Sequence, residues 1–214
     1  MSDLFAAQVH GTRTRLGRHA CVLHGFALPV AAELLAGVEV VSAAAPFRHL
    51  VTPGGHAMSV AMTNCGSLGW CSDRRGYRYD PRDPGTCRRW PAMPQAFLRL
   101  AADAADAAGF ADYRPDACLI NRYAPGTRLT LHQDRDESDH VAPIVSVSLG
   151  LPATFLFGGF ARGDKTVRVP VAHGDVVVWG GVDRMRFHGV LPVRDGMHPL
   201  LGAQRINLTF RKAT

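Results

Sequence analysis

The sequence predicts a mainly β protein with flanking helices, built around a double-stranded β-helix, or jelly roll. Three observations support this fold class. From residue 117 onward, short apolar segments follow one another at a spacing of roughly 8 to 12 residues. Turn-forming pairs such as Pro-Gly and Gly-Gly separate these segments. Before residue 117, two stretches repeat their apolar residues with the period of a helix.

The first part of the chain, residues 1–45, predicts an N-terminal extension that ends in a helix. The stretch LPVAAELLAGVEVV, residues 28–41, opens with a proline that suits a first helical turn. Its apolar residues recur on one face, as an amphipathic helix requires. They are Val30, Leu34, Leu35, Val38 and Val41.

The second part, residues 46–92, contains glycine, proline, aromatic residues and arginine with little helical period, which predicts a long functional loop region or a small hairpin subdomain. Residues 73–89 hold six arginines and three aspartates, so half of the net charge of +6 lies there. Trp70, Tyr77 and Tyr79 lie among or beside these charges, and such a mixture can bind bases and phosphates. An ordinary exposed loop explains the clustering equally well.

The third part, residues 93–214, predicts a helix followed by the jelly roll. The alanine-rich stretch 94–109 ends at a glycine, which is a natural helix cap. Eight predicted strands follow: ACLINRY (117–123), RLTLH (128–132), PIVSVSLG (143–150), ATFLF (153–157), TVRVP (166–170), DVVVW (175–179), MRFHGV (185–190) and RINLTF (205–210). We expect the three parts to form one compact unit.

Composition narrows the class of protein further. A chain of 214 residues with 47% hydrophobic content can bury a core, and the net charge of +6 favours polyanionic partners. The five cysteines are odd in number and include no Cys-x-x-Cys pair, which predicts reduced thiols. Because neither a signal peptide nor a membrane span is visible, we expect a soluble cytoplasmic monomer.

The stretch LHQDRDE, residues 131–137, holds a pair of candidate metal ligands. His132 and Asp134 are two residues apart, so on an extended chain both side chains leave the same face. A solvated acidic turn is the alternative. A metal site needs a third ligand, and His188 is favoured over His173 and His198 because it lies at the end of a strand. Two imidazoles and one carboxylate suit non-haem Fe(II), with zinc as the other option.

The last predicted strand, RINLTFR at 205–211, alternates apolar and polar residues. One interpretation is a half-buried strand with a solvated polar face. The other is that Arg205 and Arg211 point inward and bind a dicarboxylate co-substrate, since paired guanidinium bonds hold carboxylates strongly. Asn121 and Tyr123 share one face of another strand and could donate to the same ligand.

Taken together, these motifs resemble the AlkB family of Fe(II)- and 2-oxoglutarate-dependent dioxygenases. The resemblance rests on N-R-Y at 121–123, H-Q-D at 132–134, His188 and R-I-N-L-T-F-R at 205–211. It extends over the segments 49–70, 115–126, 142–159 and 173–181. The segment that ends in Trp70 is the part most specific to nucleic-acid demethylases.

The resemblance implies a role for each matching residue. His132, Asp134 and His188 would ligate Fe(II). The pocket for 2-oxoglutarate would comprise Asn121, Tyr123, Arg205, Asn207 and Arg211. Arg205 would bind the distal carboxylate and Arg211 the carboxylate near the metal. The region 46–92 would be a nucleotide-recognition lid, and substrate contacts would come from Trp70, Tyr77, Asp136 and Arg162.

The implied reaction is oxidative demethylation of N-alkylated bases such as 1-methyladenine and 3-methylcytosine, with release of formaldehyde, succinate and CO2. The substrate would be single- or double-stranded DNA, and RNA in some cases. Two other functions stay open at this point. One is a 2-oxoglutarate dioxygenase that acts on a protein or a small molecule. The other is a nucleic-acid-binding module with a structural metal, which the complete ligand set and both arginines argue against.

Overall fold

The computed structural model describes residues 11–214, so the first ten residues of the expected N-terminal extension lie outside the described part. Its helices are α1 (Ala31–Ala44) and α2 (Gln95–Ala107). Its strands are β1 (Arg13–Arg15), β2 (Ala20–Leu23), β3 (Arg48–Val51), β4 (Ala57–Gly66), β5 (Gly69–Asp73), β6 (Gly76–Asp80), β7 (Ala117–Tyr123), β8 (Leu129–His132), β9 (Ile144–Gly150), β10 (Ala153–Phe157), β11 (Val167–Val171), β12 (Val176–Trp179), β13 (His188–Val190) and β14 (Arg205–Arg211).

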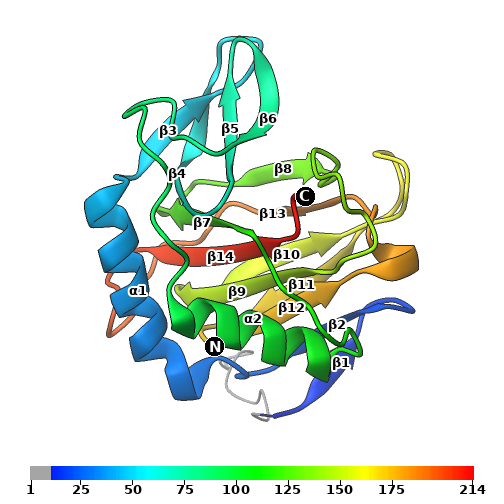
Figure 1. The fold of residues 1–214 in the computed structure, drawn as a ribbon. Helices are drawn as coiled ribbons and strands as arrows, with labels where there is room; N and C mark the ends of the chain where they lie inside the picture. The colour runs from blue at the N-terminus through cyan, green and yellow to red at the C-terminus, as the bar shows by residue number, and fades with distance from the viewer. Residues whose placement is uncertain (1–10) are drawn as a thin grey trace.

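Two facing sheets form the core of the fold (Figure 1). In residues 11–214 the large sheet has the strand order β1-β2-β12-β9-β14-β7-β4-β3, and the small sheet has the order β11-β10-β13-β8. All the pairings within both sheets are antiparallel. Each of the eight predicted segments after residue 117 forms a strand, so the predicted jelly roll is confirmed.

The two helices cover the outer face of the large sheet. Helix α2 presents small alanine side chains and Phe97, whose ring packs edge-on against Phe210 of β14 at 5.9 Å. Helix α1 can approach α2 closely because Gly37 has no side chain, and a Cβ there would lie 2.7 Å from the Phe97 ring. Helix α1 begins after a 3-10 turn at Leu28–Val30 and therefore starts and ends later than the predicted helix.

The inner faces of the two sheets enclose a second, smaller core. Aromatic residues of β10 and β12 fill its lower part, where the Phe155 ring lies 5.7 Å from Trp179 and 6.0 Å from Phe157. The inner face of β14 does not follow this apolar pattern, because it contributes buried polar side chains. Apolar side chains therefore fill only part of the space between the sheets, and a cavity remains beside the polar residues of β14.

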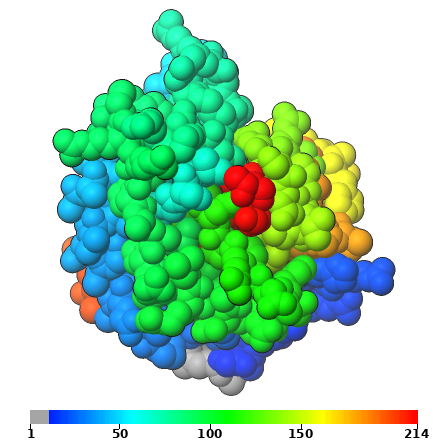
Figure 2. Space-filling view, viewed as in Figure 1, coloured from blue at the N-terminus to red at the C-terminus, as the bar shows by residue number. Residues whose placement is uncertain are grey.

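The region 46–92 divides into two structural parts. Strands β3 and β4 extend the large sheet, since β4 pairs with β7 from Ala61 to Gly66. The chain then leaves the sheet and forms the β5–β6 hairpin, which projects from the body of the protein (Figures 1 and 2). It returns at Pro91, whose carbonyl accepts a hydrogen bond of 2.9 Å from the amide of Gly66. A backbone hydrogen bond therefore joins the two ends of the segment that carries the hairpin.

The N-terminal part adds strands that the sequence analysis did not predict. Strand β2 pairs with β12, and β1 pairs with β2 at the edge of the large sheet. All five cysteines are free thiols, as expected. Among residues 11–214, neither α-helix is long and apolar enough to cross a membrane.

Candidate metal and co-substrate site

A cavity of about 580 Å³ lies between the two sheets and below the β5–β6 hairpin. All the side chains to which the family resemblance assigns a role line this cavity. They come from the hairpin, from β7, β8, β13 and β14, and from the loops after β8 and β10. The fold therefore brings together residues that are separated by up to 141 positions, from Trp70 to Arg211.

Two histidines converge because their strands are neighbours. His132 of β8 and His188 of β13 occupy directly opposite positions, and their ring centroids lie 4.4 Å apart. Asp134 follows β8, with carboxylate oxygens 3.5 Å from Nε2 of His132 and 3.7 Å from Nε2 of His188. The three ligand atoms lie within 4.8 Å of one another, as the ligands of one metal ion do.

The other two candidate histidines lie elsewhere. The rings of His173 and His198 lie 4.5 Å apart, and Nδ1 of His173 accepts a hydrogen bond from the amide of Gly150. Neither ring lines the cavity. The structure thus places His188, and neither His173 nor His198, beside His132 and Asp134.

Backbone carbonyls orient both imidazoles of the triad. Nδ1 of His132 lies 2.9 Å from the carbonyl of Thr130, and Nδ1 of His188 lies 3.0 Å from the carbonyl of Arg186. A proton on each Nδ1 leaves both Nε2 lone pairs free for a metal. Burial and the nearby His188 lower the pKa of His132 to about 4, so His132 is in its neutral, metal-binding form at pH 7.

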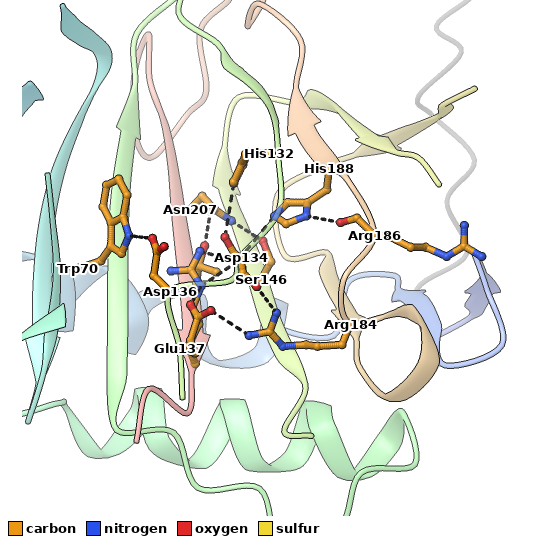
Figure 3. A network of polar contacts seen from close by, with 12 residues as sticks. Trp70, His132, Asp134, Asp136, Glu137, Ser146, Arg184, Arg186, His188 and Asn207 are labelled. Carbon is orange, nitrogen blue, oxygen red and sulfur yellow. Dashed lines mark hydrogen bonds and ion pairs between the residues drawn. The ribbon is translucent and has the colours of Figure 1, made fainter. Parts of the chain in front are cut away.

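Asp134 is buried, and two arginines support it (Figure 3). Nε and Nη2 of Arg211 lie 2.8 and 2.7 Å from its Oδ2, and Arg184 donates to its backbone carbonyl. Burial alone would raise the pKa of Asp134, but the charge of Arg211 and the facing histidines hold it well below the usual range. Asp134 is therefore a carboxylate anion, the form that binds metal.

Strand β14 has two buried faces. Ile206, Leu208 and Phe210 pack against the helices, while the alternate residues face the cavity between the sheets. Every residue from Arg205 to Arg211 is buried. The interpretation of this stretch as a strand with a solvated polar face is therefore wrong.

Arg205 lies deep in the cavity without an acidic partner. Its side chain is 2% exposed, Nη2 donates to Oγ of Ser148 at 3.0 Å, and its guanidinium lies 4.8 Å from the ring centroid of Tyr123. No described residue accepts a hydrogen bond from its Nε or Nη1. Burial lowers the pKa of Arg205, yet an arginine remains charged. A buried cation with free donors requires an anion, and a ligand carboxylate would supply it.

The neighbouring polar groups extend this pocket toward the metal ligands. Nδ2 of Asn207 donates to Oγ of Ser146 at 2.8 Å and to the carbonyl of Val147 at 2.9 Å. Asn121 lies across from Asn207 in the β7–β14 pairing, and its Oδ1 has no hydrogen-bond partner among the described residues. Besides the free donors of Arg205, the pocket therefore offers one unsatisfied acceptor, Oδ1 of Asn121.

This donor set fits Fe(II) together with a dicarboxylate. Two imidazoles and one carboxylate on one side of a cavity form a facial triad and leave coordination positions open. The unpaired guanidinium of Arg205 fits a distal carboxylate, as expected for 2-oxoglutarate.

Comparison with known proteins identifies the class. Residues 19–211 match the model of the 2OG-Fe(II) oxygenase superfamily. The chain is 55% identical over 213 residues to the alpha-ketoglutarate-dependent dioxygenase AlkB of Escherichia coli (strain K12). That match covers all of this chain and 98% of the E. coli protein. The chain belongs to the AlkB family.

Other members of the AlkB family show weaker similarity. The AlkB homolog of Caulobacter vibrioides is 48% identical over 181 residues, which is 84% of this chain and 79% of that protein. The human nucleic acid dioxygenase ALKBH1 is 32% identical over 123 residues, or 58% of this chain and 31% of that protein. The solved structure of OsALKBH1 superposes with a TM-score of 0.82 at 26% identity, covering 94% of this chain and all of that chain.

The residues expected to contact substrate in this AlkB-family chain form the mouth of the cavity. Trp70 and Tyr77 of the hairpin stack at 5.5 Å with an interplanar angle of 14°. Nε1 of Trp70 donates to Oδ2 of Asp136 at 2.8 Å. Arg162 donates to the carbonyl of Leu131 and lies over the ring of Phe187 at 5.2 Å. Each of these groups could contact a base or phosphate that enters the cavity.

Sequence reasoning missed an ion-pair network under the triad (Figure 3). Glu137 is 5% exposed, and it lies 3.2 Å from Arg184 and 3.3 Å from Arg211. The hydroxyl of Tyr79, in the hairpin, donates to Glu137 at 2.7 Å.

The polar pocket residues Ser146 and Ser148 were also missed, although two serines at alternate positions of an otherwise apolar strand were a usable signal.

Proposed function

We propose that this AlkB-family dioxygenase removes methyl groups from N-alkylated bases, such as 1-methyladenine and 3-methylcytosine, in DNA, with RNA as a second substrate. The observation that carries the proposal is the position of the stacked Trp70 and Tyr77 at the mouth of the cavity that holds the triad. A planar base can pack against this aromatic pair while its methyl group lies near the metal ligands.

The chain's own residues would hold the reactants in place. His132, Asp134 and His188 would hold Fe(II), and Arg205 would bind the distal carboxylate of 2-oxoglutarate. When bound, the metal and this co-substrate supply hydroxylation of the methyl group by O2, with succinate and CO2 as by-products. The hydroxymethyl product then loses formaldehyde and leaves the unmodified base.

Charge on the hairpin supports a polyanionic substrate. Arg74 and Arg75 lie at its exposed tip, and Arg75 pairs with Asp73 at 3.1 Å. Arg78 also binds Asp73, at 2.9 Å. The remaining positive charge would attract phosphates before a base enters the cavity.

A single assay tests the proposed function. The purified protein is incubated with Fe(II), ascorbate, 2-oxoglutarate and oligonucleotides that carry 1-methyladenine or 3-methylcytosine, and products are measured by mass spectrometry. We expect loss of one methyl mass and an equal amount of formaldehyde. The His132→Ala variant is the matched control and should give neither product.

Other outcomes of this assay identify the alternatives. Succinate production that depends on a protein or small-molecule substrate, with no oligonucleotide product, would assign the enzyme to another substrate class. Oligonucleotide binding without any 2-oxoglutarate turnover would indicate a binding module. The monomeric state and the cytoplasmic location stay predictions from the sequence.

A further inference from the structure

The loop between β10 and β11, residues 158–166, carries an aromatic side chain that the proposed site does not use. Phe160 is 55% exposed. Two residues later, Arg162 lines the cavity and donates to the carbonyl of Leu131, the residue before the ligand His132. Phe160 therefore lies on a loop that borders the cavity mouth.

The backbone on the other side of Phe160 also contacts the cavity wall. The amide of Gly158 donates to the carbonyl of Phe187, and the amide of Phe187 donates to the carbonyl of Gly159. Phe187 lines the cavity, and His188 follows it directly. These bonds continue the β10–β13 pairing as far as Gly159 and fix the position of the backbone next to Phe160.

One face of the Phe160 ring is covered by a fixed cation. The guanidinium of Arg186 lies 4.9 Å from the ring centroid. Arg186 is held by Asp183, at 2.5 Å, and by the carbonyl of Gly158, at 2.9 Å. The loop itself is closed by Asp164, whose carboxylate accepts from the amide of Ala161 at 2.9 Å. The ring is thus held in place while more than half of its surface stays in solvent.

The surroundings of Phe160 favour a polyanion with aromatic groups. Residues 158–168 contain three basic residues and one acidic residue. Among the described residues, Phe160 and Tyr77 are the exposed large aromatic side chains, and the other large exposed apolar side chains are aliphatic. Tyr77 belongs to the hairpin at the top of Figure 1, and Phe160 belongs to the separate yellow loop at the right. The loop that borders the cavity at Arg162 therefore carries a second exposed aromatic side chain, beside positive charge.

We propose that Phe160 is a stacking platform for a second nucleobase of the substrate, one that stays outside the catalytic cavity. This proposal rests on the proposed function. When one base leaves the stack to enter the cavity, a neighbouring base loses a stacking partner. The free face of Phe160 can replace that partner, and Arg162 and Lys165 can contact the adjoining phosphates. The base could come from the same strand or from the position opposite the lesion.

Fluorescence of 2-aminopurine, which falls when this base stacks, identifies the base that Phe160 contacts. The probe is placed at each position within two nucleotides of a 1-methyladenine, and separately opposite it in a duplex. We expect one position at which wild-type protein quenches the probe and Phe160→Ala does not. A same-strand position assigns the neighbouring base, and the opposite position assigns the unpaired base. Quenching that never depends on Phe160 overturns the proposal.

Steady-state kinetics test the same contact independently. We expect Phe160→Ala to raise KM for a methylated oligonucleotide about fivefold to tenfold with kcat unchanged. Phe160→Trp should restore KM, because it retains a π-face. KM for the methylated mononucleotide should stay unchanged, since it has no second base. Val40→Ala, which truncates an exposed apolar residue on α1, is the matched control and should behave as wild type.

The outcomes distinguish failure of the Phe160 stacking proposal from failure of the proposed demethylase function. If wild-type protein demethylates oligonucleotides and Phe160→Ala has wild-type KM, the stacking platform is wrong and the proposed function stands. If wild-type protein has no activity on any methylated oligonucleotide, the proposed function itself is wrong. A melting temperature of Phe160→Ala equal to that of Val40→Ala shows that a change in KM does not come from unfolding.

Discussion

The indole Nε1 of Trp70 donates a hydrogen bond of 2.8 Å to Oδ2 of Asp136, so the hairpin is tied to a carboxylate two residues beyond the proposed metal ligand Asp134. The sequence analysis proposed Asp136 as a substrate contact, and a carboxylate at that position could recognise the positive charge of a methylated base. In the structure Asp136 also positions the aromatic side chain on which the base would stack. These two roles respond differently to substitution.

Asp136→Asn keeps an oxygen that can accept from Trp70 and removes the negative charge. We expect turnover on cationic 1-methyladenine and 3-methylcytosine to fall about fivefold relative to neutral 1-methylguanine, because solvent screens a charge contact at an exposed residue to ~1 kcal/mol. Asp136→Ala also releases Trp70 and should lower turnover on all three lesions. Equal losses on charged and neutral lesions in Asp136→Asn would show that Asp136 recognises no charge.

The metal ligands should differ in their effect on stability. His132→Ala should abolish turnover and leave the melting temperature of the metal-free protein close to that of wild type. Asp134→Ala should abolish turnover and also destabilise the protein by ~3 kcal/mol, because it removes a buried partner of Arg211. Thermal unfolding without metal measures both. Demethylation by either variant would contradict the triad.

Arg205 and Arg211 should separate co-substrate binding from stability. Arg205 has no carboxylate partner among residues 11–214, so Arg205→Leu should raise the KM for 2-oxoglutarate by about two orders of magnitude without lowering the melting temperature. Arg211 pairs with Asp134 and Glu137, so Arg211→Leu should lower both co-substrate affinity and the melting temperature. If the KM of Arg205→Leu for 2-oxoglutarate equalled that of wild type, Arg205 would not be the residue that binds the distal carboxylate.

The metal-free protein should lose stability as the pH falls from about 6.5 to 4. Burial lowers the pKa of His132 to about 4, whereas the unfolded chain has an ordinary histidine pKa of about 6.5. The unfolded state therefore binds more protons in this window, and stability decreases with acidification. The depressed pKa of Asp134 adds a loss below about pH 4, the ordinary aspartate value, as pH falls toward its folded pKa. Urea unfolding at several pH values measures the slope, which His132→Ala should reduce between pH 6.5 and 4.

The hairpin arginines should bind the phosphates of the substrate, whereas Trp70 should stack on its methylated base. Neutralising Arg74 and Arg75 should weaken binding of methylated and unmethylated strands alike and reduce the salt slope by about one to two. Trp70→Ala should weaken binding of the methylated strand by ~1 to 3 kcal/mol and leave the salt slope unchanged. Binding titrations at several salt concentrations distinguish the two effects. The same change in slope for both variants would contradict this division.

Much of the fold was predictable because the strands after residue 117 each have local apolar patterns and turn residues. Strands β3 and β4 were not predicted, since their residues alternate less clearly. The partner that joins β4 to the large sheet, β7, lies more than fifty residues away, and β3 joins the sheet only through β4. Strand β2 was missed for a similar reason, because its four residues gain their strand context from β12.

The site was predictable where one motif carried several ligands, as in H-x-D and R-x-N-x-x-x-R. It was not predictable at Glu137, which lies in the polar stretch DRDESD and resembles a solvated turn. Its burial depends on Arg184 and Arg211, which are 47 and 74 positions away. Local pattern gives no information about such a long-range charge pair.

The closed base of the hairpin makes this part of the molecule exchangeable. Gly66 and Pro91 are joined by a backbone hydrogen bond, so the chain between them leaves and re-enters the core at nearly one point. Segments with such adjacent ends tolerate replacement by segments of other lengths when their contacts with the rest of the protein are kept, here those of Tyr79 with Glu137 and of Trp70 with Asp136. A hairpin from a relative with a different lesion preference could therefore be grafted between these residues, provided that it retains the tyrosine and the tryptophan that bind Glu137 and Asp136 beside the pocket.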